Sequence, residues 1–170
     1  KRRRNILRDN TFRQGIVFLV NYLWGDWPVP EHPRSGTASV KREWKEQIEK
    51  FRRVFGRTPD GISSHEHVHY FPPYFSIALG LANHYKIPFI RFGKKGFAGE
   101  KNSVYLILKI MRWINRKKFF RSDISSSDYF TSLDWVGNKR NFLRKIPNGK
   151  IEIACHPERE DEMEMIDRIF

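Results

Sequence analysis

The chain has 170 residues, a hydrophobic fraction of 39% and a net charge of +13 at neutral pH. Its 14 Phe, 6 Tyr and 5 Trp favour a packed globule over a disordered chain, and the length suits a single domain, residues 1–170. No apolar run approaches the roughly 20 residues that span a bilayer, so we expect no membrane partner. The single cysteine, Cys155, has no internal disulfide partner, which favours a reducing, cytoplasmic location.

The positive charge is concentrated in three segments, and the C-terminal tail is acidic. The basic segments are 1–4, 41–53 and 112–121, and the acidic one is 158–167. A basic surface attracts polyanions, so a nucleic-acid or other polyanion-binding module is one hypothesis. No helix-turn-helix, zinc-finger or RNA-recognition signature accompanies the charge, which favours an ordinary solvated surface. The chain begins at Lys1 rather than Met and ends inside a helical pattern, as expected for a piece of a longer protein.

Helical and extended patterns alternate from residue 60 to the end of the chain. In chain order we expect a helix at 40–55, a strand at 62–69, a helix at 74–85, a strand at 87–91, a loop at 93–99, a helix at 102–119, a strand and loop at 124–132, a helix at 133–143, a strand at 151–155 and an acidic helix after it. No hairpin signal interrupts this alternation. It therefore predicts an α/β fold with a parallel sheet or barrel.

Three of the six histidines, His65, His67 and His69, occupy alternate positions in one short segment. In an extended strand they would share one face, with neighbours roughly 7 Å apart. Two imidazoles at that spacing can reach one cation, so the pattern favours a metal or catalytic site. The alternative is a surface strand whose histidines meet only water.

Polar residues follow or end several of the expected strands. They are the histidine segment 65–69, Arg91, Asp128 and His156. Active sites of parallel α/β proteins collect at the carboxyl ends of the strands. We therefore expect these residues to line one cleft of an enzyme.

Five segments of the chain carry a family resemblance. They are 44–51, 59–69, 79–91, 127–130 and 152–157, the last containing Cys155-His156-Pro157. In order and spacing they resemble the YdjC-like carbohydrate deacetylases, with the resemblance strongest over about residues 40–160. The resemblance implies a distorted TIM-like (β/α) barrel, incomplete in this chain. It also implies removal of N-acetyl groups from amino sugars or oligosaccharides with one divalent cation, Mg or Zn.

The resemblance also implies roles for single residues. His65 would bind the metal, with His69 or His67 as a second ligand, and His156 would be the general acid that protonates the departing amine. Arg91 would orient a base or stabilise the oxyanion. Asp128 and His67 would contact the N-acetylated sugar substrate.

Three positions depart from the family pattern. The first-strand Asp-Asp motif that supplies the base and one metal ligand has no match, Leu19 stands where a metal histidine is expected, and Ser63 replaces an Asp. The cation site is therefore expected to be weakened or lost in this chain. A degenerate or truncated relative that binds sugar without turnover remains a second hypothesis, beside the hydrolase and the polyanion-binding module.

Overall fold

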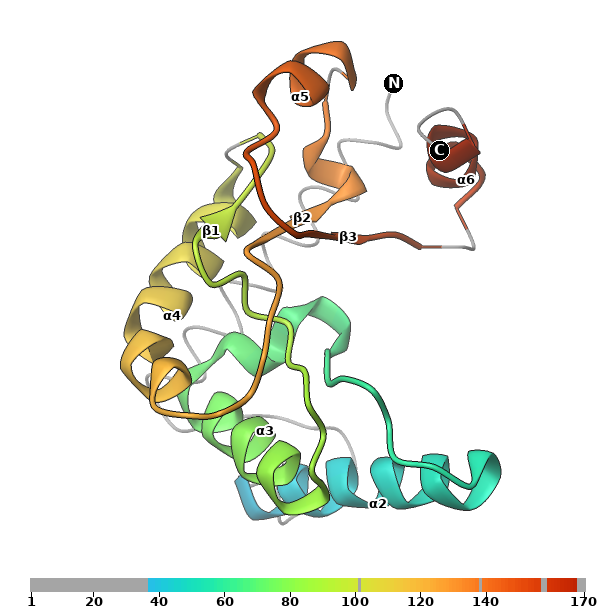
Figure 1. The fold of residues 1–170 in the computed structure, drawn as a ribbon, viewed down its shortest axis with the longest axis vertical. Coiled ribbons are helices and arrows are strands. Elements are labelled where there is room, and N and C mark those ends of the chain that lie inside the picture. Colours follow the sequence, from blue (N-terminus) through green and yellow to red (C-terminus); the bar gives the residue numbers. More distant parts are fainter. Residues whose placement is uncertain (1–36, 101, 138, 157–158, 168–170) are drawn as a thin grey trace.

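The structure, a computed structural model, describes residues 37–100, 102–137, 139–156 and 159–167. In chain order the elements are α2 (Thr37–Phe55), η1 (His65–Tyr70), α3 (Pro72–Tyr85), β1 (Gly96–Phe97), α4 (Ser103–Phe120), β2 (Tyr129–Ser132), η2 (Leu133–Trp135), α5 (Lys139–Lys145), β3 (Ile151–Ala154) and α6 (Glu160–Asp167), where η denotes a 3-10 helix. Figure 1 shows β1 beside α4, β2 and β3 farther from that helix, and α2 and α3 at one end of the molecule. The Leu19 assignment and the Lys1–Arg4 cluster lie outside the described residues.

The described strands form one parallel sheet in the order β1-β2-β3. Phe97 pairs with Phe130, and Phe130 pairs with Glu152. Isolated parallel bridges continue the same direction, joining Ile62 to Ile90 and Phe89 to Ser125. Strands that run parallel and are separated by helices confirm the α/β class, and the arrangement is consistent with an incomplete (β/α) barrel.

Local sequence signals fix the ends of the principal helices. Pro72 and Pro73 occupy the first turn of α3, where a missing N–H costs nothing, and Lys86 ends that helix in the left-handed conformation with φ 54°. Asn102 caps α4 by accepting a hydrogen bond from the Tyr105 amide at 2.8 Å. Helix α2 ends at Gly56, whose φ of 64° suits glycine. These signals explain why the helix boundaries expected from sequence differ from the observed ones by few residues.

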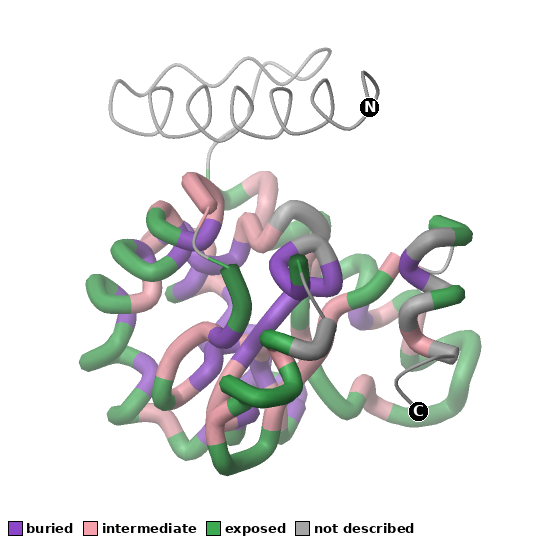
Figure 2. The backbone as a smooth tube through the Cα atoms, turned by 90° about the horizontal axis from the view of Figure 1, so that it is seen from above, coloured by how far each residue is buried: buried purple, intermediate pink, exposed green. Residues whose placement is uncertain are grey.

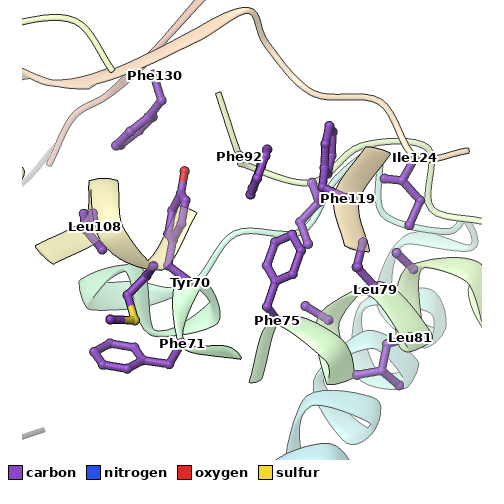
Figure 3. Close-up of a cluster of buried hydrophobic side chains, with 14 of the residues drawn as sticks. Tyr70, Phe71, Phe75, Leu79, Leu81, Phe92, Leu108, Phe119, Ile124 and Phe130 are labelled. Atoms are coloured by element: carbon purple, nitrogen blue, oxygen red, sulfur yellow. The ribbon is translucent and has the colours of Figure 1, made fainter. Parts of the chain in front are cut away.

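Aromatic side chains from the strand segments, α3 and α4 fill the core (Figure 3). Phe92 lies at its centre, stacked on Phe119 at 4.2 Å between ring centroids and in contact with Phe75 at 5.2 Å. All three rings are almost completely buried, and Figure 2 shows the buried residues gathered mainly in the interior of the described fold. Burying a large aromatic side chain contributes on the order of 2 kcal/mol, so this cluster holds α3 and α4 against the strands.

The prediction of a strand over 62–69 is wrong. Only Ile62 is paired in a parallel bridge, and the three histidines lie in the 3-10 helix η1. Ser64 causes the turn, because its hydroxyl accepts the His69 amide hydrogen at 2.9 Å and draws the backbone back on itself. His67 adopts a left-handed φ of 56° within this turn. The histidines therefore do not share one face of a strand.

Two further boundaries differ from expectation. The expected loop at 93–99 contains β1, and the helix expected at 133–143 is two pieces, η2 and α5, rather than one helix. Gly93 permits the first difference, because its φ of 66° lets the chain bend and continue along the sheet. In the part of the chain that the structure describes, no helix has the length and apolar character needed to cross a bilayer.

Candidate functional site

His69 is completely buried, and both of its ring nitrogens are used. Its Nε2–H donates to the Arg91 carbonyl oxygen at 2.9 Å, which makes Nδ1 the acceptor of the Ser64 hydroxyl at 2.7 Å. The side chain therefore ties η1 to the segment around Arg91 as a neutral imidazole. Neither nitrogen is open to a metal ion in this arrangement, which does not fit the expected role of His69 as a metal ligand.

Burial lowers the pKa of His69 from its ordinary 6.5 to about 4, and the nearby Arg91 charge acts in the same direction. Between pH 6.5 and pH 4, His69 is mostly protonated in the unfolded chain and mostly neutral in the folded chain. The stability that His69 contributes is thus complete above pH 6.5 and is lost as the pH falls toward 4.

We expect the free energy of unfolding to fall by about 3 kcal/mol over this range because of His69 alone. Urea unfolding at pH 7 and pH 4.5 measures the loss, and His69→Gln should reduce the difference between the two pH values. His84→Gln is the matched control, because His84 is exposed on α3. An equal pH dependence in wild type and His69→Gln would show that other groups cause the acid sensitivity.

Arg91 lies beside the sheet and pairs with a residue of β3. Its Nε–H donates to Glu152 Oε1 at 2.6 Å, and its guanidinium lies 4.9 Å from the centre of the Phe130 ring. The two charged side chains are only 16% and 21% exposed. Among the described residues the terminal guanidinium nitrogens of Arg91 have no hydrogen-bond partner. Glu152 and Phe130 therefore fix the cation in place and leave its outer N–H groups for another molecule.

A second layer of this site consists of aromatic rings. His67 packs edge-on against Phe130, with centroids 5.1 Å apart, and lies 6.2 Å from the Trp135 ring. Tyr70 is fully buried below it, and burial together with the Glu152 charge raises the pKa of its hydroxyl far above the ordinary value. Tyr70 therefore stays neutral at working pH. The structure thus joins His67, Arg91 and the backbone around His69 in one neighbourhood.

His156 follows β3 and is held by an acidic residue of α6. Its Nδ1 lies 3.0 Å from Glu162 Oε1, and its amide donates to Glu162 Oε2 at 2.7 Å. Burial alone would raise the pKa of Glu162, but the hydrogen bonds from His156 outweigh it and lower the pKa of that carboxyl below its ordinary value. A carboxylate at Nδ1 leaves Nε2 as the nitrogen that can exchange a proton with a substrate.

Asp128 lies at the amino ends of the parallel strands, whereas His156 lies at their carboxyl ends. It precedes β2 and accepts the Lys150 amide hydrogen at 3.1 Å, which with the nearby Lys95 lowers the pKa of its carboxyl. The expected position at the carboxyl end of a strand is therefore wrong, because the strand begins only at Tyr129. Asp128 joins the amino ends of β2 and β3, and within the described part of the chain it makes no hydrogen bond or ion pair with Arg91 or His156.

The expected metal site is not assembled by the described residues. The side chain of His65, the principal expected ligand, lies outside the described part of the structure. Among the side chains that the structure does describe, no three of His, Cys, Asp or Glu lie close enough together to hold a metal ion.

Three residues of the site were missed at the level of sequence. Ser64 orients His69, Glu152 binds Arg91, and Glu162 binds His156. Only Glu152 had a usable signal, because a charged residue in the apolar run Ile151–Ala154 needs a partner. Glu162 lies in an acidic helix among other carboxylates, and nothing in the pattern distinguishes it from them.

The sequence model of one protein family, described as YdjC-like protein, matches residues 7–169, nearly the whole chain. The chain belongs to the YdjC-like family. A carbohydrate deacetylase of Halalkalibacterium halodurans is 31% identical over 124 residues, which are 73% of this chain and 45% of the relative. A chitooligosaccharide deacetylase of Escherichia fergusonii is 36% identical over 131 residues, 77% of this chain and 48% of the relative.

A third relative, a carbohydrate deacetylase of Geobacillus stearothermophilus, is 40% identical over 65 residues, 34% of this chain and 26% of that protein. The chain thus spans about half the length, or less, of the curated relatives it matches. No solved structure matches it. The match to the family model confirms the family resemblance that the sequence motifs indicated.

Proposed function

We propose that the protein containing this chain is a hydrolase that removes N-acetyl groups from amino sugars or their oligomers. Support comes from membership of a family whose similar members are named carbohydrate and chitooligosaccharide deacetylases. Among the geometric features, the His156–Glu162 pair supports it most directly. A histidine held by a buried carboxylate is a common form of general acid and base.

His156 supplies a proton in this reaction. Its Nδ1–H donates to the Glu162 carboxylate, which fixes the orientation of the ring and leaves Nε2 for the substrate. Water adds its oxygen to the acetyl carbon, the C–N bond breaks, and the proton on Nε2 moves to the departing amine nitrogen. The products are acetate and the free amino sugar, and His156 recovers its proton from the attacking water through solvent.

Arg91 is the residue that we assign to the developing negative charge on the acetyl oxygen. Glu152 and Phe130 hold its guanidinium without using the terminal nitrogens. Hydrogen bonds from a fixed cation to such an oxygen stabilise the transition state more than the substrate. Glu152 is then a positioning residue for Arg91 rather than a catalytic one.

The cation that the family resemblance implies, Mg or Zn, remains part of the proposal. Catalytic sites of this kind have about three protein ligands and one open position. The described residues supply no such set, so any site requires side chains outside that set, and we expect His65 to be one of its ligands. We therefore expect the 170-residue chain to bind divalent cations weakly and to deacetylate poorly or not at all.

Calorimetric titration of the chain with zinc and with magnesium tests the first half of this expectation, and an amine-release assay on N-acetylglucosamine oligomers tests the second. His65→Ala should remove what metal binding there is, whereas His84→Ala, an exposed histidine on α3, should not. A version of the protein extended upstream, where the gene encodes an Asp-Asp strand, should release amine efficiently. Micromolar metal binding and efficient turnover by the 170-residue chain would contradict the expectation. Sugar binding without amine release in the extended version would favour the non-catalytic hypothesis instead.

A further inference from the structure

Helix α4 has two apolar faces, and only one of them is covered by the described residues. Its inner face contributes Tyr105, Leu108, Met111 and Phe119 to the core. On the outer face, large apolar side chains recur at helical spacing and are about half exposed or more. They are Leu106 at 51%, Ile110 at 55%, Trp113 at 72%, Ile114 at 45% and Phe120 at 54%. We call these five residues the outer stripe of α4.

The outer stripe is an unusual feature of this surface. Five of the nine large apolar side chains exposed in the described part of the chain belong to it. Spacings of three, four and seven residues place them on one side of the helix, and Figure 1 shows α4 along the flank of the molecule. Scattered exposed apolar residues need no explanation, but a continuous stripe marks a contact surface.

Basic side chains accompany the stripe along α4, and the nearest acidic residue in the sequence after the helix is Asp123. Lys109, Arg116 and Lys117 are exposed on the same helix, and Arg121 follows at its end. Helix α4 contains no Asp or Glu, and neither does its neighbour α3. By contrast α2, which is also basic, alternates its cations with Glu43, Glu46 and Glu49. The charged side chains of α4 itself are therefore all of one sign.

A second copy of the chain does not fit this surface. Pairing two outer stripes would bring Lys109, Arg116 and Lys117 against their own copies with no carboxylate between them. Like charges placed opposite one another in an interface oppose association. The occupant must instead offer apolar groups and negative charge together.

We propose that the outer stripe of α4 docks on an anionic lipid surface. Trp and large aliphatic side chains enter the boundary between headgroups and acyl chains, while Lys and Arg extend their charged ends to the phosphates. Lys109, Arg116 and Lys117 supply the electrostatic part of the contact, and Trp113 with Ile110 supplies the apolar part. The helix lies on such a surface and does not cross it, whereas the expectation of no membrane partner rested only on the lack of a spanning segment. The contact is independent of amide hydrolysis.

Sedimentation of the 170-residue chain with vesicles tests the contact. We expect binding to vesicles of phosphatidylserine and phosphatidylcholine, and at least tenfold weaker binding to phosphatidylcholine alone. Trp113 fluorescence should be quenched by brominated acyl chains, and Trp113→Phe should remove that quenching. The absence of binding to the anionic vesicles at low salt would overturn the proposal.

Two paired variants separate insertion from simple charge attraction. Ile110→Ser with Trp113→Ser should weaken binding at least tenfold at unchanged charge. Lys109→Glu with Lys117→Glu should do the same or more, whereas the matched reversal Lys41→Glu with Lys50→Glu on α2 should weaken binding much less. Circular dichroism checks that each variant is folded.

Three results would replace the lipid by another occupant and overturn the proposal. Binding that the charge variant weakens but the Ser variant leaves unchanged would indicate a general polyanion contact. A dimer in lipid-free solution that the Ser variant dissociates would indicate a second copy. Vesicle binding by the chain but not by the longer protein would indicate that the rest of the protein covers α4.

Discussion

Replacing Arg91 by Met should lower the free energy of unfolding by about 3 kcal/mol, and replacing Glu152 by Leu should cost a similar amount. The pair is mostly buried, at 16% and 21% exposure, so each single change leaves a charge away from water without its partner. Glu152 Oε2 is already buried with no hydrogen-bond partner among the described residues, which makes the carboxylate dependent on Arg91. Denaturant unfolding at pH 7 measures both losses.

The double variant Arg91→Met with Glu152→Leu should cost much less than the sum of the two single variants. Two apolar side chains of similar volume leave no charge to desolvate, so the pair is replaced at little net cost. Arg57 and Asp60 form the matched control pair, because both are exposed and Arg57 Nη1 also lies 2.6 Å from Asp60 Oδ2. A double-mutant cycle on that pair should give a coupling energy below about 1 kcal/mol.

Equal coupling energies for the buried and the exposed pair would contradict the burial argument. Single variants at Arg91 and Glu152 that each cost under about 1 kcal/mol would contradict it as well. In either case Glu152 would have no special part in holding Arg91 in place.

The parallel α/β architecture could be predicted because alternating patterns constrain topology strongly. Phe75 and Phe119 lie on the core faces of helices whose apolar period is clear in the sequence. The strand expected at 62–69 failed because one hydroxyl, that of Ser64, turns the backbone into a 3-10 helix. A local side-chain bond of that kind leaves the alternation of the sequence unchanged, so periodicity alone could not reveal it.

The site was less predictable than the fold because its geometry depends on partners far apart in the chain. Arg91 was expected to be functional, but its partner Glu152 comes 61 residues later. Asp128 was expected at the carboxyl end of a strand. It lies instead at the amino end, because β2 starts at Tyr129, one residue later. For His69 the residue type suggested a ligand, whereas in this structure both ring nitrogens form hydrogen bonds with protein groups.

Replacing His156 by Ala should reduce kcat for amine release by roughly 10²–10⁴-fold, the range typical of a lost general acid or base. The imidazole acts on the departing amine and is not needed to hold the sugar, so KM should change by only a few-fold. Glu162→Gln keeps the shape of the orienting side chain but removes its charge, and should lower kcat by a smaller factor. His84→Ala is the matched control, because His84 is exposed on α3 and packs only against Tyr85 among the described rings.

The most direct measurement is therefore kcat and KM for deacetylation of N-acetylglucosamine oligomers by a catalytically active, upstream-extended version of the protein and its His156→Ala variant. We expect kcat to fall at least about a hundredfold with KM nearly unchanged and with the fold intact by circular dichroism. An unchanged kcat in the His156→Ala variant would remove His156 from the reaction and, with it, the mechanism proposed for this chain.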